Sequence, residues 1–146
     1  MAFQFKQFRI EDDQCSMKVG TDSILLGSWA KAEEGSLVDI GSGCGLLSLM
    51  LAQRFPNIHI TAIEFHRESF IQGKSNFESS HWPNRIRAIH ADVKTWQPEK
   101  LFDHVICNPP YFIGSLSALS PERTNARQDK TLSYSELWRC IERITK

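Results

Sequence analysis

The sequence predicts an α/β fold in which helices cover both faces of a mostly parallel sheet. Four short apolar segments, at 37–40, 58–64, 86–90 and 102–107, alternate along the chain with segments of helical periodicity. Strands that alternate with helices indicate βαβ units, whose parallel strands are buried on both faces. The residues of unusual chemistry follow these strands directly, as expected of a site at the carboxyl edge of a parallel sheet. A chain of 146 residues with 41% apolar side chains is long enough for one such domain.

The other elements are expected from local patterns. Residues 3–10 carry apolar side chains at nearly alternating positions, which predicts an extended arm or a hairpin. Thr21-Asp22-Ser23 precedes the apolar run 24–30 and predicts an N-cap and a short helix. Longer helices are expected over 46–55 and 67–79.

Two helices have a predicted inward side. In the helix over 67–79, that side holds Phe70, Ile71, Lys74 and Phe77. A capping-box spacing, with Ser133 three residues before Glu136, opens the last helix. Its inward side is expected to hold Leu137, Cys140, Ile141 and Ile144.

Composition excludes several classes of protein. The formal net charge is zero, because 17 Lys and Arg balance 17 Asp and Glu; this argues against a disordered tail and a wholly basic surface. A local basic patch still permits RNA or DNA as a substrate.

The four cysteines include no C-x-x-C pair and the five histidines show no ligand spacing, so we expect buried, unpaired thiols and no metal. The longest apolar run, 46–52, is too short for a membrane span, and the start lacks a signal peptide's apolar core. We therefore expect a soluble, cytoplasmic protein.

The first strand runs into a glycine turn, Gly41-Ser42-Gly43-Cys44-Gly45. Glycines allow a ligand to approach the backbone closely, and the helix that follows offers free N–H groups. A dinucleotide fingerprint needs its third glycine at position 46, which is Leu46. The spacing instead suits a nucleoside cofactor without a pyrophosphate; a plain tight turn is the alternative.

Two acidic residues end the next strands. Glu64, nineteen residues after Gly45, is placed to accept hydrogen bonds from both hydroxyls of a ribose, with a solvated strand end as the alternative. Asp92 follows the third strand and can accept from the exocyclic amine of an adenine. An ordinary turn-forming Asp is nearly as good an interpretation of Asp92.

The fourth strand enters Asn108-Pro109-Pro110-Tyr111. Two prolines make the turn stiff, Asn108 supplies a side-chain carbonyl and Tyr111 supplies an aromatic face. This set suits a planar amine such as that of adenine, whose lone pair is delocalised into the ring. If its N–H groups donate to the Asn108 side chain and the Pro109 carbonyl, the lone pair can localise toward an electrophile. A purely structural Pro-Pro turn is the alternative.

Together, the glycine turn, Glu64, Asp92 and Asn108-Pro-Pro-Tyr111 resemble the class I S-adenosylmethionine-dependent methyltransferases that act on amino nitrogens. More narrowly, the chain resembles the valine tRNA (adenine-37-N6)-methyltransferase family over nearly its whole length. The flanking segments that carry this likeness are 15–22, 25–29, 80–86 and 126–132. DNA adenine, ribosomal RNA guanine and protein glutamine methyltransferases share the Asn-Pro-Pro-Tyr motif, so the substrate depends on the flanking segments.

The resemblance implies a Rossmann-like three-layer sandwich that binds S-adenosylmethionine and methylates N6 of an adenine in tRNA. Residues 1–35 would form an arm and short helix closing over the cofactor site, and 36–146 part of the methyltransferase core. Asn108, Pro109 and Tyr111 would present the adenine. The implied cofactor-binding residues are Lys18, Gly20, Thr21 and Asp22 over the methionine end, Asp39 beneath the turn, Gly41, Gly43 and Gly45 around the methionine, Glu64 at the ribose and Asp92 at the adenine.

An RNA substrate also needs basic side chains. Arg123, Arg127 and Lys130 follow the Asn-Pro-Pro-Tyr motif and are the expected RNA contacts, with further candidates in Lys6, Arg9 and Lys18. Each of these charges, taken singly, is more simply a solvated surface residue.

Length is the one departure from this family, whose fold has seven strands. Only four strands are accounted for here, so we expect a sheet that is incomplete at the C-terminus, with the fourth strand an exposed apolar edge prone to self-association. Methyl transfer is expected to be weak or absent until the remainder is supplied. Protein glutamine N5-methylation and a non-catalytic cofactor-binding fragment are the alternatives, with an NAD-linked oxidoreductase last because of Leu46.

Overall fold

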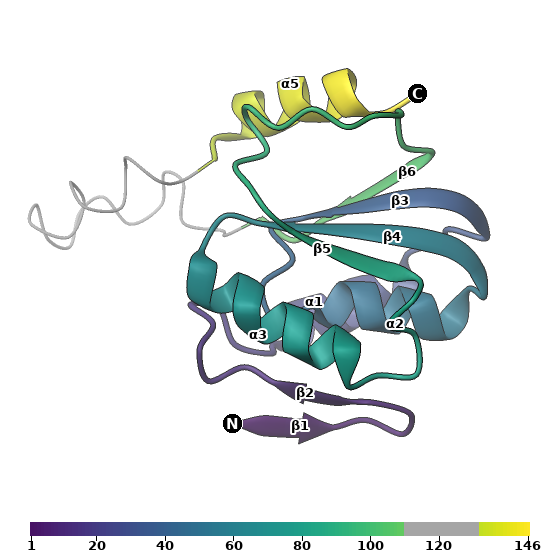
Figure 1. The fold of residues 1–146 in the computed structure, drawn as a ribbon, viewed down its shortest axis with the longest axis vertical. Helices are drawn as coiled ribbons and strands as arrows, with labels where there is room; N and C mark the ends of the chain where they lie inside the picture. Colours follow the sequence, from purple (N-terminus) through teal and green to yellow (C-terminus); the bar gives the residue numbers. More distant parts are fainter. Residues whose placement is uncertain (110–131) are drawn as a thin grey trace, which may run out of the picture.

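A four-stranded parallel sheet forms the centre of the molecule (Figure 1). A computed structural model describes residues 1–109 and 132–146 of the chain. The strands are β3 (Glu34–Ile40), β4 (Asn57–Glu64), β5 (Ile86–His90) and β6 (His104–Cys107), in the order β5-β4-β3-β6. All three pairings are parallel, which confirms the predicted α/β class. The chain moves from β3 outward through β4 to β5 and then returns to the other side of β3. Parallel sheets bind ligands at such a reversal of strand order.

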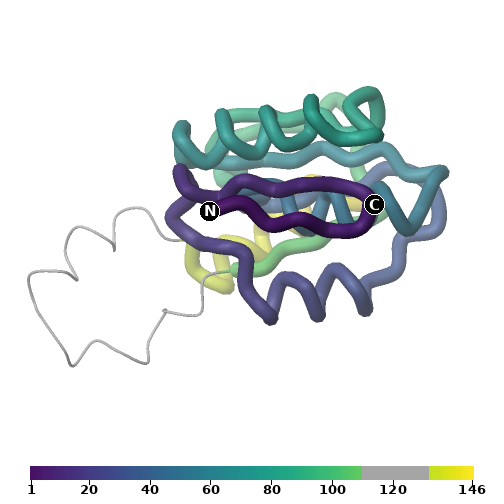
Figure 2. The backbone as a smooth tube through the Cα atoms, turned by 90° about the horizontal axis from the view of Figure 1, so that it is seen from below, coloured from purple at the N-terminus to yellow at the C-terminus, as the bar shows by residue number. Residues whose placement is uncertain are grey.

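Helices cover both faces of the sheet, as predicted. One face carries α1 (Thr21–Trp29), α2 (Leu46–Arg54) and α3 (Arg67–Glu78), and the opposite face carries α5 (Tyr134–Ile144) (Figure 1). The predicted arm is an antiparallel hairpin of β1 (Ala2–Gln4) and β2 (Arg9–Glu11). Figure 2 shows this hairpin lying across the helical layer, between α3 and α1.

The alternation of side chains along each strand produces two hydrophobic clusters. Leu37 and Ile60 pack with Leu49 of α2, whereas Val38 and Ile63 belong to a second cluster on the other face. This second cluster includes Leu137, Cys140 and Ile144 of α5, as the pattern of that helix predicts. Burying one such side chain contributes about 1.5–3 kcal/mol, so both helical layers stabilise the strands that carry the site. The expectation of unpaired thiols is confirmed, since all four cysteines are free; Cys15, Cys44 and Cys140 are also buried as expected, whereas Cys107 is only half-buried.

The capping box of α5 is also confirmed. Ser133 Oγ accepts from the Glu136 amide at 3.2 Å, and Glu136 Oε2 accepts from the Ser133 amide at 2.8 Å. The start of α1 is different from the prediction. This helix begins at Thr21 with Gly20 as its N-cap, and no side chain caps it. Thr21, Asp22 and Ser23 form its first turn because the extended backbone of Gly20 already supplies the cap conformation.

The predicted inward side of α3 was partly wrong. Phe77 is buried, but Ile71 is 53% exposed and Lys74 forms an exposed ion pair with Glu78. The buried residues of this helix are Ser69, Gly73, Asn76 and Phe77. Small side chains face inward because α3 passes close to the glycine turn: a Cβ added at Gly73 would lie 2.6 Å from the Gly43 carbonyl oxygen.

The start of the fourth predicted strand is not an exposed edge. Phe102 is 8% exposed and forms a parallel bridge with Thr145. Its amide donates to the Ile144 carbonyl at 2.9 Å, and its carbonyl accepts from the Lys146 amide at 3.0 Å. The regular strand accordingly begins at His104 rather than at residue 102. None of the helices in residues 1–109 and 132–146 has the length and apolarity needed to cross a bilayer.

Candidate active site

The glycine turn lies between β3 and α2. Gly41, Gly43 and Gly45 all have positive φ, at 70°, 54° and 87°. Among residues 1–109 and 132–146, a Cβ added at Gly41 or Gly43 would meet no atom within 4 Å, whereas one at Gly45 would overlap the Phe77 ring. The turn therefore presents bare backbone to open space at Gly41 and Gly43, as the predicted close approach of a ligand requires.

Strand register places three predicted site residues side by side. Ile40 at the end of β3 pairs with Ile63 of β4 and with Cys107 of β6. The next residues along these strands are Gly41, Glu64 and Asn108. The glycine turn therefore leaves the sheet between Glu64 on one side and Asn108 on the other.

The Glu64 carboxylate is buried, with 6% exposure. Oε2 accepts a hydrogen bond of 2.8 Å from the Gly43 amide, and Oε1 accepts one of 2.8 Å from the His66 amide. Each carboxylate oxygen can accept a further bond. The side chain can thus hold the turn and still receive the two hydroxyls of a ribose.

Asp39 lies beneath the turn and is completely buried. Its Oδ2 accepts from Ser48 Oγ at 2.7 Å, while Oδ1 has no hydrogen-bond partner among the described residues. Burial raises the pKa of Asp39 to about 7; the nearby Glu64 charge adds to the rise and the Ser48 hydroxyl opposes it. A buried acceptor without a donor at the base of an open turn is the kind of group that a bound ligand or water completes.

Asn108 follows β6, and its side-chain amide contacts a residue of the N-terminal part of the chain. Nδ2 donates to Ser23 Oγ on α1 at 2.9 Å. This bond uses the donor end of the side chain and leaves Oδ1, which can only accept, for another group. Pro109, the next residue, is described, whereas Tyr111 lies outside the described residues, as do Arg123, Arg127 and Lys130.

Asp92 forms a local turn after β5. Its Oδ1 accepts from the Lys94 amide at 2.9 Å, and its carbonyl accepts from the Thr95 and Trp96 amides at 3.1 and 2.9 Å. These bonds are those of the turn-forming interpretation. The turn uses Oδ1. Oδ2 lies 4.0 Å from Lys94 Nζ and can still accept a hydrogen bond near the strand end.

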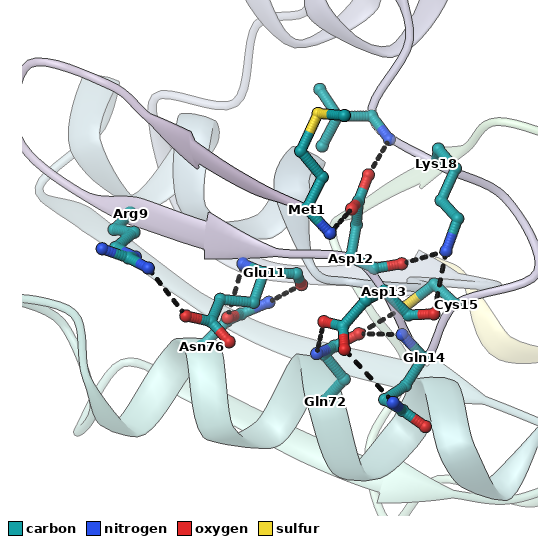
Figure 3. A network of polar contacts seen from close by, with 11 residues as sticks. Met1, Arg9, Glu11, Asp12, Asp13, Gln14, Cys15, Lys18, Gln72 and Asn76 are labelled. Carbon is teal, nitrogen blue, oxygen red and sulfur yellow. Dashed lines mark hydrogen bonds and ion pairs between the residues drawn. The ribbon is translucent and has the colours of Figure 1, made fainter.

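A network of polar contacts ties residues 12–19 to α3 (Figure 3). Lys18 Nζ donates to the carbonyls of Asp12 and Asp13 at 2.7 and 2.9 Å. Gln72 accepts from the Gln14 amide at 2.7 Å and donates to Asp13 at 2.9 Å. These two bonds use two of the three N–H donors of the Lys18 ammonium group. Only the third donor is left for the predicted contact of Lys18 with the cofactor.

Asn76 connects this network to the glycine turn. Its Oδ1 accepts from the Glu11 amide at 3.1 Å, and its Nδ2 donates to the Glu11 carbonyl at 2.8 Å (Figure 3). Nδ2 also donates to the Cys44 carbonyl at 2.8 Å. One buried side chain thus fixes β2 against the middle of the turn. After residues 12–19, Gly20 is the N-cap of α1, and Thr21 and Asp22 are exposed in the first turn of this helix.

The sequence profile of the methyltransferase small domain matches residues 15–122, which include every strand of the central sheet. The chain belongs to the methyltransferase small domain family. This membership agrees with the open glycine turn and with the acidic side chain beside it.

Several relatives of this methyltransferase domain share more than two fifths of its residues. A tRNA1(Val) (adenine(37)-N6)-methyltransferase of Vibrio cholerae is 45% identical over 144 residues, which are 98% of this chain and 59% of that protein. The protein of the same description from Bacteroides thetaiotaomicron is 42% identical over 146 residues, 99% of this chain and 62% of that protein. The chain thus spans about three fifths of the length of these relatives.

Solved structures confirm the fold of this methyltransferase domain. A SAM-dependent methyltransferase from Thiobacillus denitrificans, in complex with S-adenosyl-L-homocysteine, has a TM-score of 0.63 at 15% identity and covers 93% of this chain and 47% of its own. One from Geobacter sulfurreducens, with the same ligand, has a TM-score of 0.62 at 18% identity and covers 88% of this chain and 45% of its own.

Three residues that contact the candidate site have partners that the sequence does not indicate. Ser23 was predicted as part of a helix cap, and Ser48 and Asn76 are polar residues within helices. Their partners, Asn108, Asp39 and Cys44, lie 85, 9 and 32 residues away along the chain. Only the burial of Ser48 and Asn76, visible once the structure is known, marks them as specific contacts.

Proposed function

We propose that this chain is the catalytic core of an S-adenosylmethionine-dependent methyltransferase that acts on N6 of an adenine in tRNA, adenine 37 of valine tRNA. The observation that carries the proposal is the register of the strand ends, which sets Gly41, Glu64 and Asn108 side by side. The choice of tRNA rests on the relatives named above, which share 42–45% of its residues. A tRNA substrate also agrees with the cytoplasmic location expected from the sequence.

The described residues fit S-adenosylmethionine. Gly41 and Gly43 leave open space above the turn for its methionine portion, and Asp39 Oδ1, which has no hydrogen-bond partner in the part of the chain that the structure describes, lies beneath it. Glu64 would accept the ribose hydroxyls and Asp92 the adenine amine. The N-terminal segment, residues 1–35, would close over the methionine end through Lys18, Gly20, Thr21 and Asp22. The bound cofactor supplies a methyl group on a sulfonium sulfur.

Asn108 and Pro109 would activate the target nitrogen. The amine of adenine is a weak nucleophile because its lone pair is shared with the ring. When its two N–H groups donate to Asn108 Oδ1 and the Pro109 carbonyl, the nitrogen becomes more nearly tetrahedral and its lone pair can attack the methyl carbon. Asn108 and Pro109 would hold the nitrogen in line for transfer of the methyl group from sulfur to nitrogen, and the methylated nitrogen would then lose one proton to water. An adenine in an anticodon loop can be splayed out to reach this position, and Tyr111 would stack on it.

The test is a labelling experiment on the 146-residue chain. The protein is incubated with methyl-labelled S-adenosylmethionine and either unmodified valine tRNA, the same tRNA with guanine at position 37, or a release-factor protein with a free glutamine. We expect a low yield of N6-methyladenosine in the first tRNA, because the chain spans about three fifths of the length of its relatives, and no label in the second.

Two other results would contradict the proposal. Label in the glutamine of the release factor alone would assign the chemistry to a protein substrate. Cofactor binding by calorimetry without transfer to any of the three substrates would make the chain a non-catalytic binding domain.

A further inference from the structure

The contact between Ser23 and Asn108 joins the N-terminal segment to the reaction site. Ser23 lies in the first turn of α1 and is half-buried, and its Oγ accepts from Asn108 Nδ2 at 2.9 Å. The two residues are 85 positions apart. Ser23 does not serve the helix itself, because the N-cap of α1 is Gly20 and no side chain caps this helix.

The direction of this hydrogen bond matters for the proposed reaction. The two ends of an Asn amide have nearly the same shape, and a half-turn of the side chain exchanges the donor for the acceptor. With Nδ2 held on Ser23 Oγ, the carbonyl Oδ1 is directed away from α1. In the reverse orientation the NH2 group would face the target amine, where two donors would oppose each other.

Ser23 is held on a firmly anchored helix. Arg54 Nη1 donates to the carbonyls of Gly27 and Ala30 at 2.6 and 2.7 Å, which fixes the end of α1 to α2. A Cβ added at Gly27 would lie 2.6 Å from Met50 Sδ, so the two helices are in close contact. An acceptor on such a helix loses little freedom when it orients a neighbouring side chain.

We propose that Ser23 is a positioning residue for methyl transfer: it accepts a hydrogen bond from Asn108 Nδ2 and so directs Asn108 Oδ1 toward the target amine. This inference rests on the proposed function. It makes α1 part of the reaction site, in addition to the arm's expected role over the cofactor. In this role Ser23 acts through Asn108 rather than on the reacting nitrogen itself.

The test compares Ser23→Ala and Ser23→Thr with Ser28→Ala in the 146-residue chain. Alanine removes the hydroxyl and is a good helix former, threonine retains the hydroxyl, and Ser28 is an exposed serine of the same helix. We expect Ser23→Ala to lower kcat for tRNA methylation by about five- to tenfold, as loss of one hydrogen bond does. The Kd for S-adenosylhomocysteine and the thermal midpoint should match those of Ser28→Ala, and Ser23→Thr should restore kcat to within about twofold of the wild type.

A second measurement tests the orientation without catalysis. The side-chain amide protons of Asn108 are assigned in the 15N-labelled protein by their loss in Asn108→Ala, and their exchange with solvent is measured by NMR. Exchange should be faster in Ser23→Ala than in the wild type, and slow again in Ser23→Thr.

These two measurements separate failure of this inference from failure of the proposed function. Active wild type with an equally active Ser23→Ala overturns the positioning role alone. Wild type that transfers no methyl group to tRNA contradicts the proposed function, and the NMR comparison then decides whether Ser23 orients Asn108. Exchange that is the same in wild type and Ser23→Ala overturns the inference in either case.

Discussion

Glu64 Oε2 accepts a hydrogen bond of 2.8 Å from the Gly43 amide in the middle of the glycine turn. The carboxylate therefore accepts the hydrogen bond of an N–H group that a phosphate-binding turn would direct at its ligand. The negative charge of Glu64 would also repel a phosphate at this position. The contact leaves this amide unavailable to a pyrophosphate, in agreement with Leu46 at the position of the third fingerprint glycine, and it places an acceptor for ribose hydroxyls beside the turn.

Glu64→Gln should weaken cofactor binding and the fold together. A glutamine side chain has one accepting oxygen in place of two, so it cannot satisfy both the Gly43 and His66 amides. One backbone N–H group would then be buried without a partner, which costs about 1–3 kcal/mol of unfolding free energy. We expect the Kd for S-adenosylhomocysteine, measured by calorimetry, to rise about tenfold or more, because charged hydrogen bonds contribute about 1.5–3 kcal/mol.

The matched control for this substitution is Glu68→Gln. Glu68 is exposed in the first turn of α3, and removing its charge should leave affinity and urea unfolding as in the wild type. Equal affinities of Glu64→Gln and Glu68→Gln would exclude Glu64 from the cofactor site.

Asn108→Ala should separate catalysis from cofactor binding. The substitution removes the proposed acceptor for the target amine and leaves the glycine turn and Glu64 in place, so kcat should fall by about two orders of magnitude. The Kd for S-adenosylhomocysteine should stay within about twofold, less than the effect of one hydrogen bond. Single-turnover methyl transfer measures the first quantity, with Asn84→Ala, an exposed asparagine, as the control. Turnover equal to that of Asn84→Ala would remove Asn108 from the reaction.

Local patterns were sufficient to predict most of the fold. The strand over 86–90 and the capping box at Ser133 were predicted at their observed positions, because a short segment with apolar residues between turns and a Ser-x-x-Glu spacing each have a local physical cause. The inward side of α3 was not predictable in this way. Ile71 satisfies the apolar period but faces solvent, because the close approach of Gly73 to the glycine turn sets the rotation of the helix.

The site was predictable as a set of strand ends but not as a set of contacts. Residues that follow parallel strands must gather at one edge, so Gly41, Glu64 and Asn108 could be grouped from the sequence. The second layer of contacts depends on tertiary packing: Ser48 reaches Asp39 from α2, and Asn76 reaches Cys44 from α3. No local period or motif encodes which polar residue of a helix will face such a group.

Gly73→Ala tests the packing of α3 against the glycine turn. The added Cβ would lie 2.6 Å from the Gly43 carbonyl oxygen, a backbone atom that can move only with the turn. We expect the unfolding free energy to fall by about 1–3 kcal/mol, as overpacking typically causes, and the affinity for S-adenosylhomocysteine to fall with it. Urea unfolding and calorimetry measure the two effects. Ser75→Ala, at an exposed position of the same helix, should change neither quantity, and a Gly73→Ala protein as stable as Ser75→Ala would show that the turn does not constrain this helix.

Asp39 should make the ligand-free protein less stable as the pH rises. Burial raises the pKa of this carboxyl from 3.8 to about 7. Between these values the folded protein holds a proton that the unfolded chain has released, so the contribution of Asp39 to stability is fully present below pH 3.8 and is lost as the pH rises to about 7.

Asp39→Asn isolates this contribution, because the amide occupies the same position and does not titrate. The Asn NH2 group has no acceptor in place of the buried Oδ1, but that cost is the same at every pH. The difference in unfolding free energy, variant minus wild type, should therefore rise from pH 4.5 to pH 7.5, by a few kcal/mol at most. Urea unfolding of both proteins over this range measures the slope. A difference that does not change with pH would mean that Asp39 ionises as readily in the folded protein as in the unfolded chain, and the site would then carry two negative charges, on Asp39 and Glu64, before any ligand binds.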